Sequence, residues 1–491
     1  MMNCFKKIAS IILAIVFVFS LASCESKSSK AIIYFEFENE PKNLDPQTAS
    51  DDGELMLVRN LFEGLMRKDE NGNIVEGACE KYSKSGLKYT FKLRENLLWS
   101  DKTPITADDF VFGLQRAVQK TTAAPFVNRL FCIKGAKEVY GNNADVSALS
   151  VKAAGDSVVI TLEKDDPMFL ETLSTSVAMP CNREYFYKTE GEYGQTAKTI
   201  LCNGSYDIYK WSKEKFAIRL YKNENYKGAF EAENGGVFFT LKNEKSLVSS
   251  LADNDCDIAF IPSSEIKNAK ENELNIASCE NKCWMLTIGD EFDLRIKNAL
   301  LTAFSSEIYK DGLGEGFKSA KSIYPGVLNE TQADGTGLPS YDIASAKAQI
   351  SEIIKDLPDN KFPPSTLYFY ENDEIKSAAN DLLGHWQNNL SAFINMQSST
   401  SLSTLQKELN KKDLQFALFP ITANNSSTDE YLAQFGLSGE PKKAQETLLS
   451  KHNILPFAFE STNMAYTSAI TKIYMDNGNG YIDFAFVGKK V

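Results

Sequence analysis

The sequence has very few histidines and no motif that would pair one of them with a catalytic nucleophile. His385 and His452 are the only two, and they lie far apart in the chain. Histidine-based zinc sites and Ser–His–Asp hydrolysis are therefore poor hypotheses. The sequence also lacks GxSxG, HExxH and a glycine-rich phosphate loop before a helix. We expect a protein that is not an enzyme and that holds no cofactor or metal.

Positive charge is also scarce. The chain of 491 residues has 53 Lys and Arg against 65 Asp and Glu, a net charge of −12. Nucleic-acid binding needs a net basic face, so we expect no nucleic-acid partner. A hydrophobic fraction of 43% with 24% charged residues is an ordinary globular mixture. At this length we expect several domains or a large two-lobed body.

No stretch beyond residue 23 is long and apolar enough to span a membrane. At the N-terminus, Lys6 and Lys7 precede an apolar run over 8–22, which is shorter than the roughly 20 residues of a spanning helix. The run ends in Leu-Ala-Ser before Cys24. Small residues before a cysteine resemble the lipobox of bacterial lipoproteins, where that thiol is acylated and the chain is cut before it.

We therefore expect residues 1–23 to be a lipoprotein signal peptide, Cys24 to carry lipid, and residues 24–30 to be a polar tether. The mature protein would be held on the extracytoplasmic face of the cell membrane by that lipid alone. The alternative is an ordinary secretory signal in which Cys24 is incidental.

Cysteines are few in the predicted mature chain and odd in number. Apart from Cys4 and Cys24, seven remain, at 79, 132, 181, 202, 256, 279 and 283. Some could pair outside the cytoplasm, but an odd count leaves at least one thiol, and several free thiols would suit a reducing habitat. Cys279 and Cys283 are four apart, yet no second cysteine pair or histidine is near them in sequence, which argues against a metal site.

Strand and helix patterns alternate along the chain without a repeat. Period-two runs predict strands that include 34–37, 89–94, 158–162, 216–220, 455–459 and 481–487. Helical periodicity predicts helices over 51–65, from Thr106, from Ser340 and over 375–390. Thr106 is the expected helix cap, followed by the acids Asp108 and Asp109 in the first turn. Trp99 and Trp211 are expected in the core, because aromatic side chains mainly supply buried area.

Several of these segments carry a resemblance to a known family. The segments are 60–65 (NLFEGL), 90–96 (TFKLREN), 99–111 (WSDKTPITADDFV), 202–206 (CNGSY) with Trp211, 220–226 (LYKNENY), 257–259 (DIA), 294–300 (LRIKNAL) and 454–457 (ILPF). Their order and spacing resemble the solute-binding protein family 5, and within it the oligopeptide-binding proteins of ABC importers. The match is strong to about residue 230 and thin after about residue 300.

The resemblance implies a mixed α/β, periplasmic-binding-protein-like fold of two lobes with discontinuous chain and an extra subdomain. Lobe I would consist of 31–60, 170–282 and 476–491. An inserted subdomain, lobe II, would cover 61–169, and lobe III would cover 283–475. In this family the lobes close on an extended peptide, whose backbone is satisfied by main-chain groups.

The resemblance also implies ligand-binding residues. One wall would be 38–41 and the other 420–425 (PITANN), with Phe126 near the entry end. The implied contacts are Glu40, Phe126, Pro420, Ile421, Thr422 and Asn424. The family's Trp is replaced by Ile421, and its Asp, which pairs with the peptide's α-amino group, is replaced by Asn424. An amide loses the Coulombic attraction to an ammonium, so Glu40 becomes the candidate for supplying that charge. Phe126 could equally be core.

Two functions remain open from the sequence. The first is a monomeric, lipid-anchored receptor that captures oligopeptides, or a related amide-rich solute, and delivers them to an ABC permease and its ATPase. The second is a non-transport surface protein on the same scaffold, such as a peptide sensor or an adhesion factor, which the altered pocket favours somewhat. An extracellular hydrolase is a distant third, since the sequence shows no nucleophile–base pair.

Overall fold

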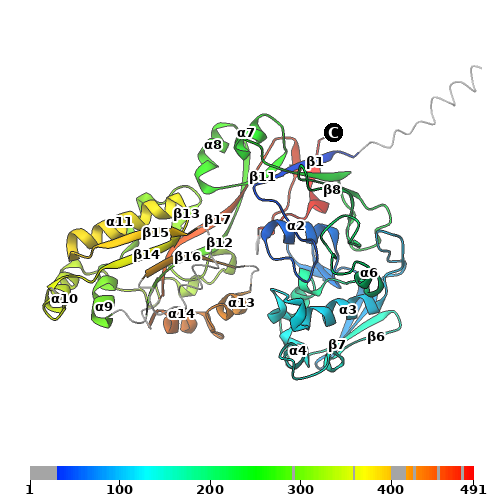
Figure 1. The fold of residues 1–491 in the computed structure, drawn as a ribbon, viewed down its shortest axis with the longest axis horizontal. Helices are drawn as coiled ribbons and strands as arrows, with labels where there is room; N and C mark the ends of the chain where they lie inside the picture. Colours follow the sequence, from blue (N-terminus) through cyan, green and yellow to red (C-terminus); the bar gives the residue numbers. More distant parts are fainter. Residues whose placement is uncertain are drawn as a thin grey trace, which may run out of the picture.

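The computed structural model describes residues 30–289, 293–357, 360–399, 416–423, 427–450, 454–476 and 480–490. Cys24 lies outside them. The chain is mixed α/β, as expected, and folds into two lobes (Figure 1). The N-terminal lobe contains strand β1 (Ile32–Phe37) and helix α2 (Asp52–Leu61). The C-terminal lobe contains helices α10 (Ile343–Lys355) and α11 (Asp373–Leu390).

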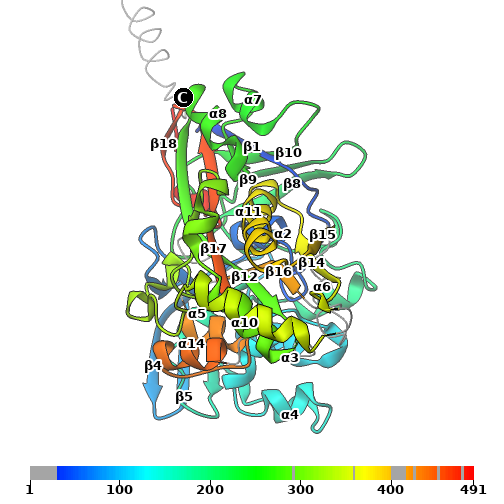
Figure 2. The ribbon, with the colours of Figure 1, turned by 90° about the vertical axis from the view of Figure 1, so that its left-hand side faces the viewer.

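One large sheet extends through both lobes. Its strand order is β15-β14-β16-β12-β17-β11-β1-β10-β9-β8, with β13 paired to β17. The remaining bounds are β8 Tyr206–Ser212, β9 Ala217–Lys222, β10 Gly236–Leu241, β11 Ile258–Ile261, β12 Asn275–Ile288, β13 Phe317–Ser319, β14 Ser365–Tyr370, β15 Ile394–Ser399, β16 Phe416–Thr422 and β17 Ile454–Tyr466. The long antiparallel strands β12 and β17 pass from one lobe to the other (Figure 1), and Figure 2 shows them running beside each other.

Smaller sheets complete the N-terminal lobe. A four-stranded sheet has the order β4-β5-β7-β6, and β2–β3 and β18–β19 form two separate two-stranded sheets. Their bounds are β2 Met66–Lys68, β3 Ile74–Glu76, β4 Cys79–Ser85, β5 Lys88–Leu93, β6 Val151–Ala154, β7 Ser157–Thr161, β18 Ile470–Lys472 and β19 Gly488–Lys489. The other helices are α3 Ala107–Val118, α4 Ala136–Tyr140, α5 Phe169–Thr172, α6 Arg183–Lys188, α7 Leu247–Ala252, α8 Ile266–Glu271, α9 Leu294–Thr302, α13 Thr428–Ala433 and α14 Pro441–Ser450.

The start of α3 shows how local sequence sets a helix boundary. The Asp109 carboxylate accepts hydrogen bonds from the backbone N–H and the hydroxyl of Thr106, at 2.8 and 3.1 Å. This capping box satisfies donors that the first helical turn leaves unpaired. Behind it, Phe110 and Leu114 are buried in the core, as the apolar stripe requires.

Each of the two lobes has an apolar core of its own. The N-terminal core contains Trp99 and Phe91, which are inaccessible to solvent, and the C-terminal core is centred on Trp386 and Trp284. The expectation for Trp99 is confirmed, whereas Trp211 is half-buried at the edge of the first core. All seven described cysteines are buried. No helix within the described ranges is long and apolar enough to cross a bilayer.

The strand predicted over 481–487 is wrong. Phe484–Phe486 form a 3₁₀ turn instead. The Asp483 carboxylate accepts the N–H of Ala485 at 3.1 Å, and Asn60 accepts the N–H of Phe484 at 2.8 Å. The side chains of Asn60 and Asp483 thus accept backbone N–H groups that a neighbouring strand would otherwise bind. The apolar residues 484–486 are therefore buried in the core from a turn and not from a strand.

Candidate functional site

A cavity of about 620 Å³ lies where the two lobes face each other. Segments 35–40 and 51–53, from β1 and the start of α2, supply the wall on the N-terminal lobe. Segment 460–463 of β17, with Lys282 on β12 and Tyr370 at the end of β14, supplies the facing wall. A volume of this size, lined from two lobes, suits a small organic ligand.

The N-terminal wall exposes backbone that is not paired. Residues 38–40 follow the end of β1 and belong to no helix or strand. Within the described chain, the N–H groups of Glu38, Asn39 and Glu40 donate no hydrogen bond to another protein atom. Backbone donors need partners, so this segment is fitted to receive main-chain groups of a ligand.

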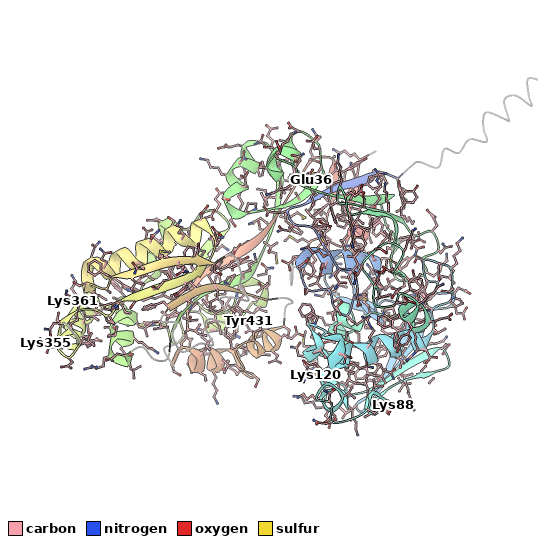
Figure 3. The ribbon with its side chains drawn as sticks, in the orientation of Figure 1. Glu36, Lys88, Lys120, Lys355, Lys361 and Tyr431 are labelled. Atoms are coloured by element: carbon pink, nitrogen blue, oxygen red, sulfur yellow. The ribbon has the colours of Figure 1, made fainter. Side chains whose placement is uncertain are left out.

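Glu36 is the most unusual side chain of this wall. It is only 6% exposed, and its Oε2 has no hydrogen-bond partner among the described residues. Burial raises the pKa of this carboxyl group above its usual range. In Figure 3 Glu36 lies where the two lobes meet. Glu36 therefore contributes to the wall of the cavity, while its Oε2 is closed off from solvent.

Two more acids stand at the start of α2. Asp51 is the N-cap, and its carboxylate accepts the N–H of Glu54 at 2.8 Å. Asp52 accepts the hydroxyl of Tyr481 at 3.0 Å, and both Asp52 and Tyr481 line the cavity. The positive end of the helix dipole stabilises these carboxylates.

The facing wall contains a polar cluster on the two long strands. The Glu460 carboxylate accepts the indole N–H of Trp284 at 2.7 Å and lies 3.4 Å from Lys282 Nζ. The β12–β17 pairing is irregular between Glu280 and Lys282, directly beside this cluster. Such irregularities bend a strand and re-aim its side chains, which places Lys282 and Glu460 at the cavity.

Of the sequence-predicted ligand residues, Glu40 lines the main cavity and Phe126 does not. Phe126 lines a separate space of about 60 Å³, together with Arg129 and Arg59. Tyr481 borders both spaces and thus lies between them. The guanidinium of Arg129 lies 5.4 Å from the centre of the Phe126 ring, a cation–π arrangement.

The second predicted wall lies beside the cavity. Pro420, Ile421 and Thr422 are on β16, where Thr422 pairs with the cavity residue Lys282. β16 continues past Leu418, the last residue that pairs with β14. None of these three side chains lines the main cavity, although all three are partly exposed. Asn424 lies outside the described residues.

Sequence reasoning missed Glu36, Asp52, Lys282, Glu460 and Tyr481. Glu36 occupies a strand position, where a period-two pattern predicts only an outward side chain. The others are distant in sequence and meet through tertiary packing. The one available signal was the density of acids over 36–40 and 51–52, which the structure brings to one wall.

Comparison with known proteins identifies the family of this two-lobed scaffold. Residues 72–443, most of the chain, match the family described as bacterial extracellular solute-binding proteins, family 5 Middle. The chain belongs to this family of solute-binding proteins.

Individual relatives are more distant. The chain is 27% identical over 383 residues to the periplasmic oligopeptide-binding protein OppA of Salmonella typhimurium, covering 73% of this chain and 69% of OppA. It is 32% identical over 241 residues to the probable deoxycholate-binding periplasmic protein YgiS of Escherichia coli. That match covers 47% of this chain and 44% of YgiS, so the chain matches less than half of that relative's length.

A solved structure shows the same fold. The substrate-binding domain of an oligopeptide ABC transporter from Bacillus anthracis superposes with a TM-score of 0.76 at 19% identity, covering 94% of this chain and all of that one. The two-lobed fold expected from the sequence is therefore confirmed.

Proposed function

We propose that this protein is an extracytoplasmic receptor that encloses an oligopeptide between its lobes and delivers it to the permease and ATPase of an ABC importer. The observation that carries the proposal is the unpaired backbone of residues 38–40 at the wall of a 620 Å³ cavity between two lobes. An extended peptide satisfies such backbone by adding main-chain hydrogen bonds, with its side chains in the surrounding space.

Lobe closure is the proposed mechanism. Ligand binding would draw the two walls together about β12 and β17, and the closed form would dock on the permease. Glu40 would meet the peptide's α-amino group. Phe126, Pro420, Ile421, Thr422 and Asn424 remain proposed contacts toward the ends of the ligand. Lipid on Cys24 would anchor the receptor to the membrane. The receptor would act as a monomer.

The relatives name two kinds of ligand, peptides for OppA and deoxycholate for YgiS. Deoxycholate carries a carboxylate. The described lining of the cavity contains six acids and one base, Lys282, and such a wall repels an anionic amphiphile. The charge of the cavity therefore favours the peptide.

Isothermal titration calorimetry tests the proposal on protein that has been unfolded and refolded to remove bound solute. Tripeptides to pentapeptides are the probes, and deoxycholate is the comparison ligand. We expect peptide binding and no binding of deoxycholate. The reverse result, or a co-purifying solute of another class in native mass spectrometry, would reject the peptide.

The sequence-based alternative, a peptide sensor or adhesion factor, shares the binding step but not transport. Deleting the gene for this protein in its own organism distinguishes the transport receptor from the sensor or adhesion factor. Loss of growth on a required amino acid supplied as peptide supports transport. Unchanged uptake of a peptide that the purified protein binds would favour the sensor.

A further inference from the structure

Four aromatic side chains form a continuous row on one face of the large sheet. They are Tyr34 on β1, Phe238 on β10, Tyr221 on β9 and Tyr209 on β8, four strands that are neighbours in the sheet. The ring centres are 5.6 Å apart from Tyr34 to Phe238, 5.6 Å from Phe238 to Tyr221 and 5.2 Å from Tyr221 to Tyr209. The row therefore crosses the last four strands of the sheet, up to its edge.

This row is exposed, although the other face of the same strands is core. Ile33 and Phe239 belong to the N-terminal core and are inaccessible to solvent. By contrast, the side chains of Tyr34, Tyr221 and Tyr209 are 43%, 37% and 68% exposed. Aromatic side chains that adjoin one another on an exposed face mark a surface that contacts a partner.

Positive charge surrounds the row, in a protein that is acidic as a whole. Segment 206–222, which contains β8, β9 and the turn between them, has five Lys and Arg and only two acids. Lys222 is paired with Glu231. The other four bases are exposed and form no ion pair among the described residues; they are Lys210, Lys213, Lys215 and Arg219. The guanidinium of Arg219 lies 5.0 Å from the centre of the Phe238 ring, so cations and rings share one face.

Exposed rings beside unpaired cations are the chemistry that fits an anionic lipid surface. Tyrosine places an apolar ring and a polar hydroxyl at the boundary between hydrocarbon and water. Lysine and arginine extend across apolar surface toward phosphate groups, and an anionic leaflet attracts them.

The place where the described chain begins favours the membrane as the partner. Six residue steps separate Cys24 from Lys30, a span of at most about 20 Å when fully extended. Lys30 is held beside the row: its Nζ donates to the carbonyl of Ala232 at 3.1 Å, four residues before β10 begins. Figure 1 shows β1 and β8 together at one end of the N-terminal lobe. If Cys24 carries lipid, this end of the sheet stays at the bilayer, where the tether raises the effective concentration of even weak contacts.

We propose that the face of β1, β10, β9 and β8 that bears this aromatic row is a membrane-contact surface, which rests on anionic lipid headgroups through Tyr209, Tyr221 and the neighbouring cations. The inference rests on the proposed function, because it takes Cys24 as the lipid anchor. The contact holds the receptor in one orientation on the membrane. A fixed orientation reduces the search that precedes docking on a permease in the same membrane.

Fluorescence quenching by brominated lipid tests the contact, with full-length acylated protein in bilayers that contain phosphatidylglycerol. All seven described cysteines are buried, so one introduced cysteine can be labelled selectively. Glu214→Cys places the fluorophore in the turn between β8 and β9, and Glu184→Cys places it on α6, which packs on α3. Both glutamates are exposed and lie in the same lobe. We expect severalfold stronger quenching at Glu214→Cys, because quenching requires close approach to lipid.

Two paired variants that carry the Glu214→Cys label test whether the row and its cations make the contact. Tyr209→Ser with Tyr221→Ser removes two rings, and Lys213→Gln with Arg219→Gln removes two cations. Each pair should lower the quenching by about half or more, because rings and cations both hold a surface at an anionic bilayer. The cation pair changes only exposed side chains, so it tests the surface even if the ring pair fails to fold.

Tyr187→Ser is the matched control for the ring pair. This tyrosine is 64% exposed and lies on α6, and its replacement should leave the quenching unchanged. Equal quenching at the Glu214→Cys and Glu184→Cys labels would reject the surface. Quenching that survives in both paired variants would reject it too, because the tether alone would then explain the proximity. A Glu214→Cys label that the permease shields, and that lipid does not quench, would reject lipid as the partner.

Intact mass and peptide calorimetry distinguish failure of this surface from failure of the proposed function. If Cys24 carries no acyl group, the proposed anchor fails and the membrane-contact surface fails with it. If Cys24 is acylated and peptides bind while the two labels are quenched equally, the receptor stands and the surface is wrong. If the labels differ as expected but no peptide binds, the surface stands and the peptide function fails.

Discussion

Arg129 and Glu430 form an ion pair across the two lobes, with 3.1 Å between the guanidinium nitrogen and the carboxylate oxygen. Arg129 lies in the 3₁₀ turn Val127–Cys132 of the N-terminal lobe, and Glu430 lies in α13 of the C-terminal lobe. Both side chains are largely buried, at 10% and 24% exposure. The pair is therefore available only when the lobes are this close, and it favours the closed arrangement.

Glu430→Gln should shift the protein toward an open arrangement. A partly buried ion pair contributes about 1 kcal/mol, so peptide affinity should fall by about fivefold. Small-angle scattering should show a larger radius of gyration without ligand, and calorimetry gives the affinity. Glu307→Gln is the control, because the Glu307–Lys310 pair lies within one lobe. Equal effects of both variants would contradict a role in closure.

Asp207→Asn should stabilise the protein above pH 6 and not below pH 4. Burial raises the pKa of Asp207 to about 6, and its Oδ1 has no partner among the described residues. Because the folded pKa exceeds the unfolded one, the native state loses stability as pH rises from about 4 to 6 and stays constant above. The asparagine variant avoids that loss.

Allowing for the partial exposure of Asp207, the expected gain is about 1 kcal/mol at pH 7.5. Urea denaturation at pH 7.5 and pH 4 measures it, with the same variant at low pH as its own control. A gain of equal size at both pH values would show that ionisation is not the cause.

How much of the fold could be predicted from the sequence depends on how far apart in the chain the interacting residues lie. The start of α3 was predictable because Thr106 and Asp109 are three residues apart and complete a cap locally. The turn at 484–486 was not, because the partner of the Phe484 N–H is Asn60, 424 residues away. Period-two patterns cannot show that a distant side chain replaces a strand.

The residues of the candidate site likewise include some that could be predicted from the sequence and some that could not. Glu40 was predicted because the family resemblance aligns a continuous segment with the ligand. Glu36 gains its character from burial and from an absent partner, which are properties of the packed lobes and not of its neighbours in sequence. Lys282 reaches the cavity through a bulge in β12, and no short motif encodes that position.

Arg116→Met should destabilise the N-terminal lobe by about 3–5 kcal/mol, since it leaves the Asp45 carboxylate buried and unpaired. Arg116 donates to Asp45 at 2.9 Å and to Gln47 at 2.7 Å, and its guanidinium lies 4.2 Å from the Phe186 ring centre. Adding Asp45→Asn should recover part of the loss in chemical denaturation, because the stranded charge is removed. Failure to recover any of it would point to packing on Phe186 instead.

Cys24→Ala should detach the protein from the membrane or leave the signal peptide uncut, because the lipobox-like sequence places the acylated thiol there. Detergent phase partitioning and intact mass measure the two results. Mutating Cys4, which lies within the predicted signal peptide, is the control and should change neither. A Cys24→Ala chain of mature size that still enters the detergent phase would show that the anchor lies elsewhere.

Glu40→Gln should weaken binding of a free-amine peptide by about 1–3 kcal/mol, since a charged hydrogen-bond partner is lost. Glu38→Gln is the matched control from the same wall. Its carboxylate is already paired with Lys242, so its replacement should change affinity far less. Blocking the peptide's α-amino group by acetylation should erase the difference between Glu40→Gln and the unmodified protein in calorimetry. A Glu40→Gln loss that persists with the acetylated peptide would mean that Glu40 contacts another part of the ligand.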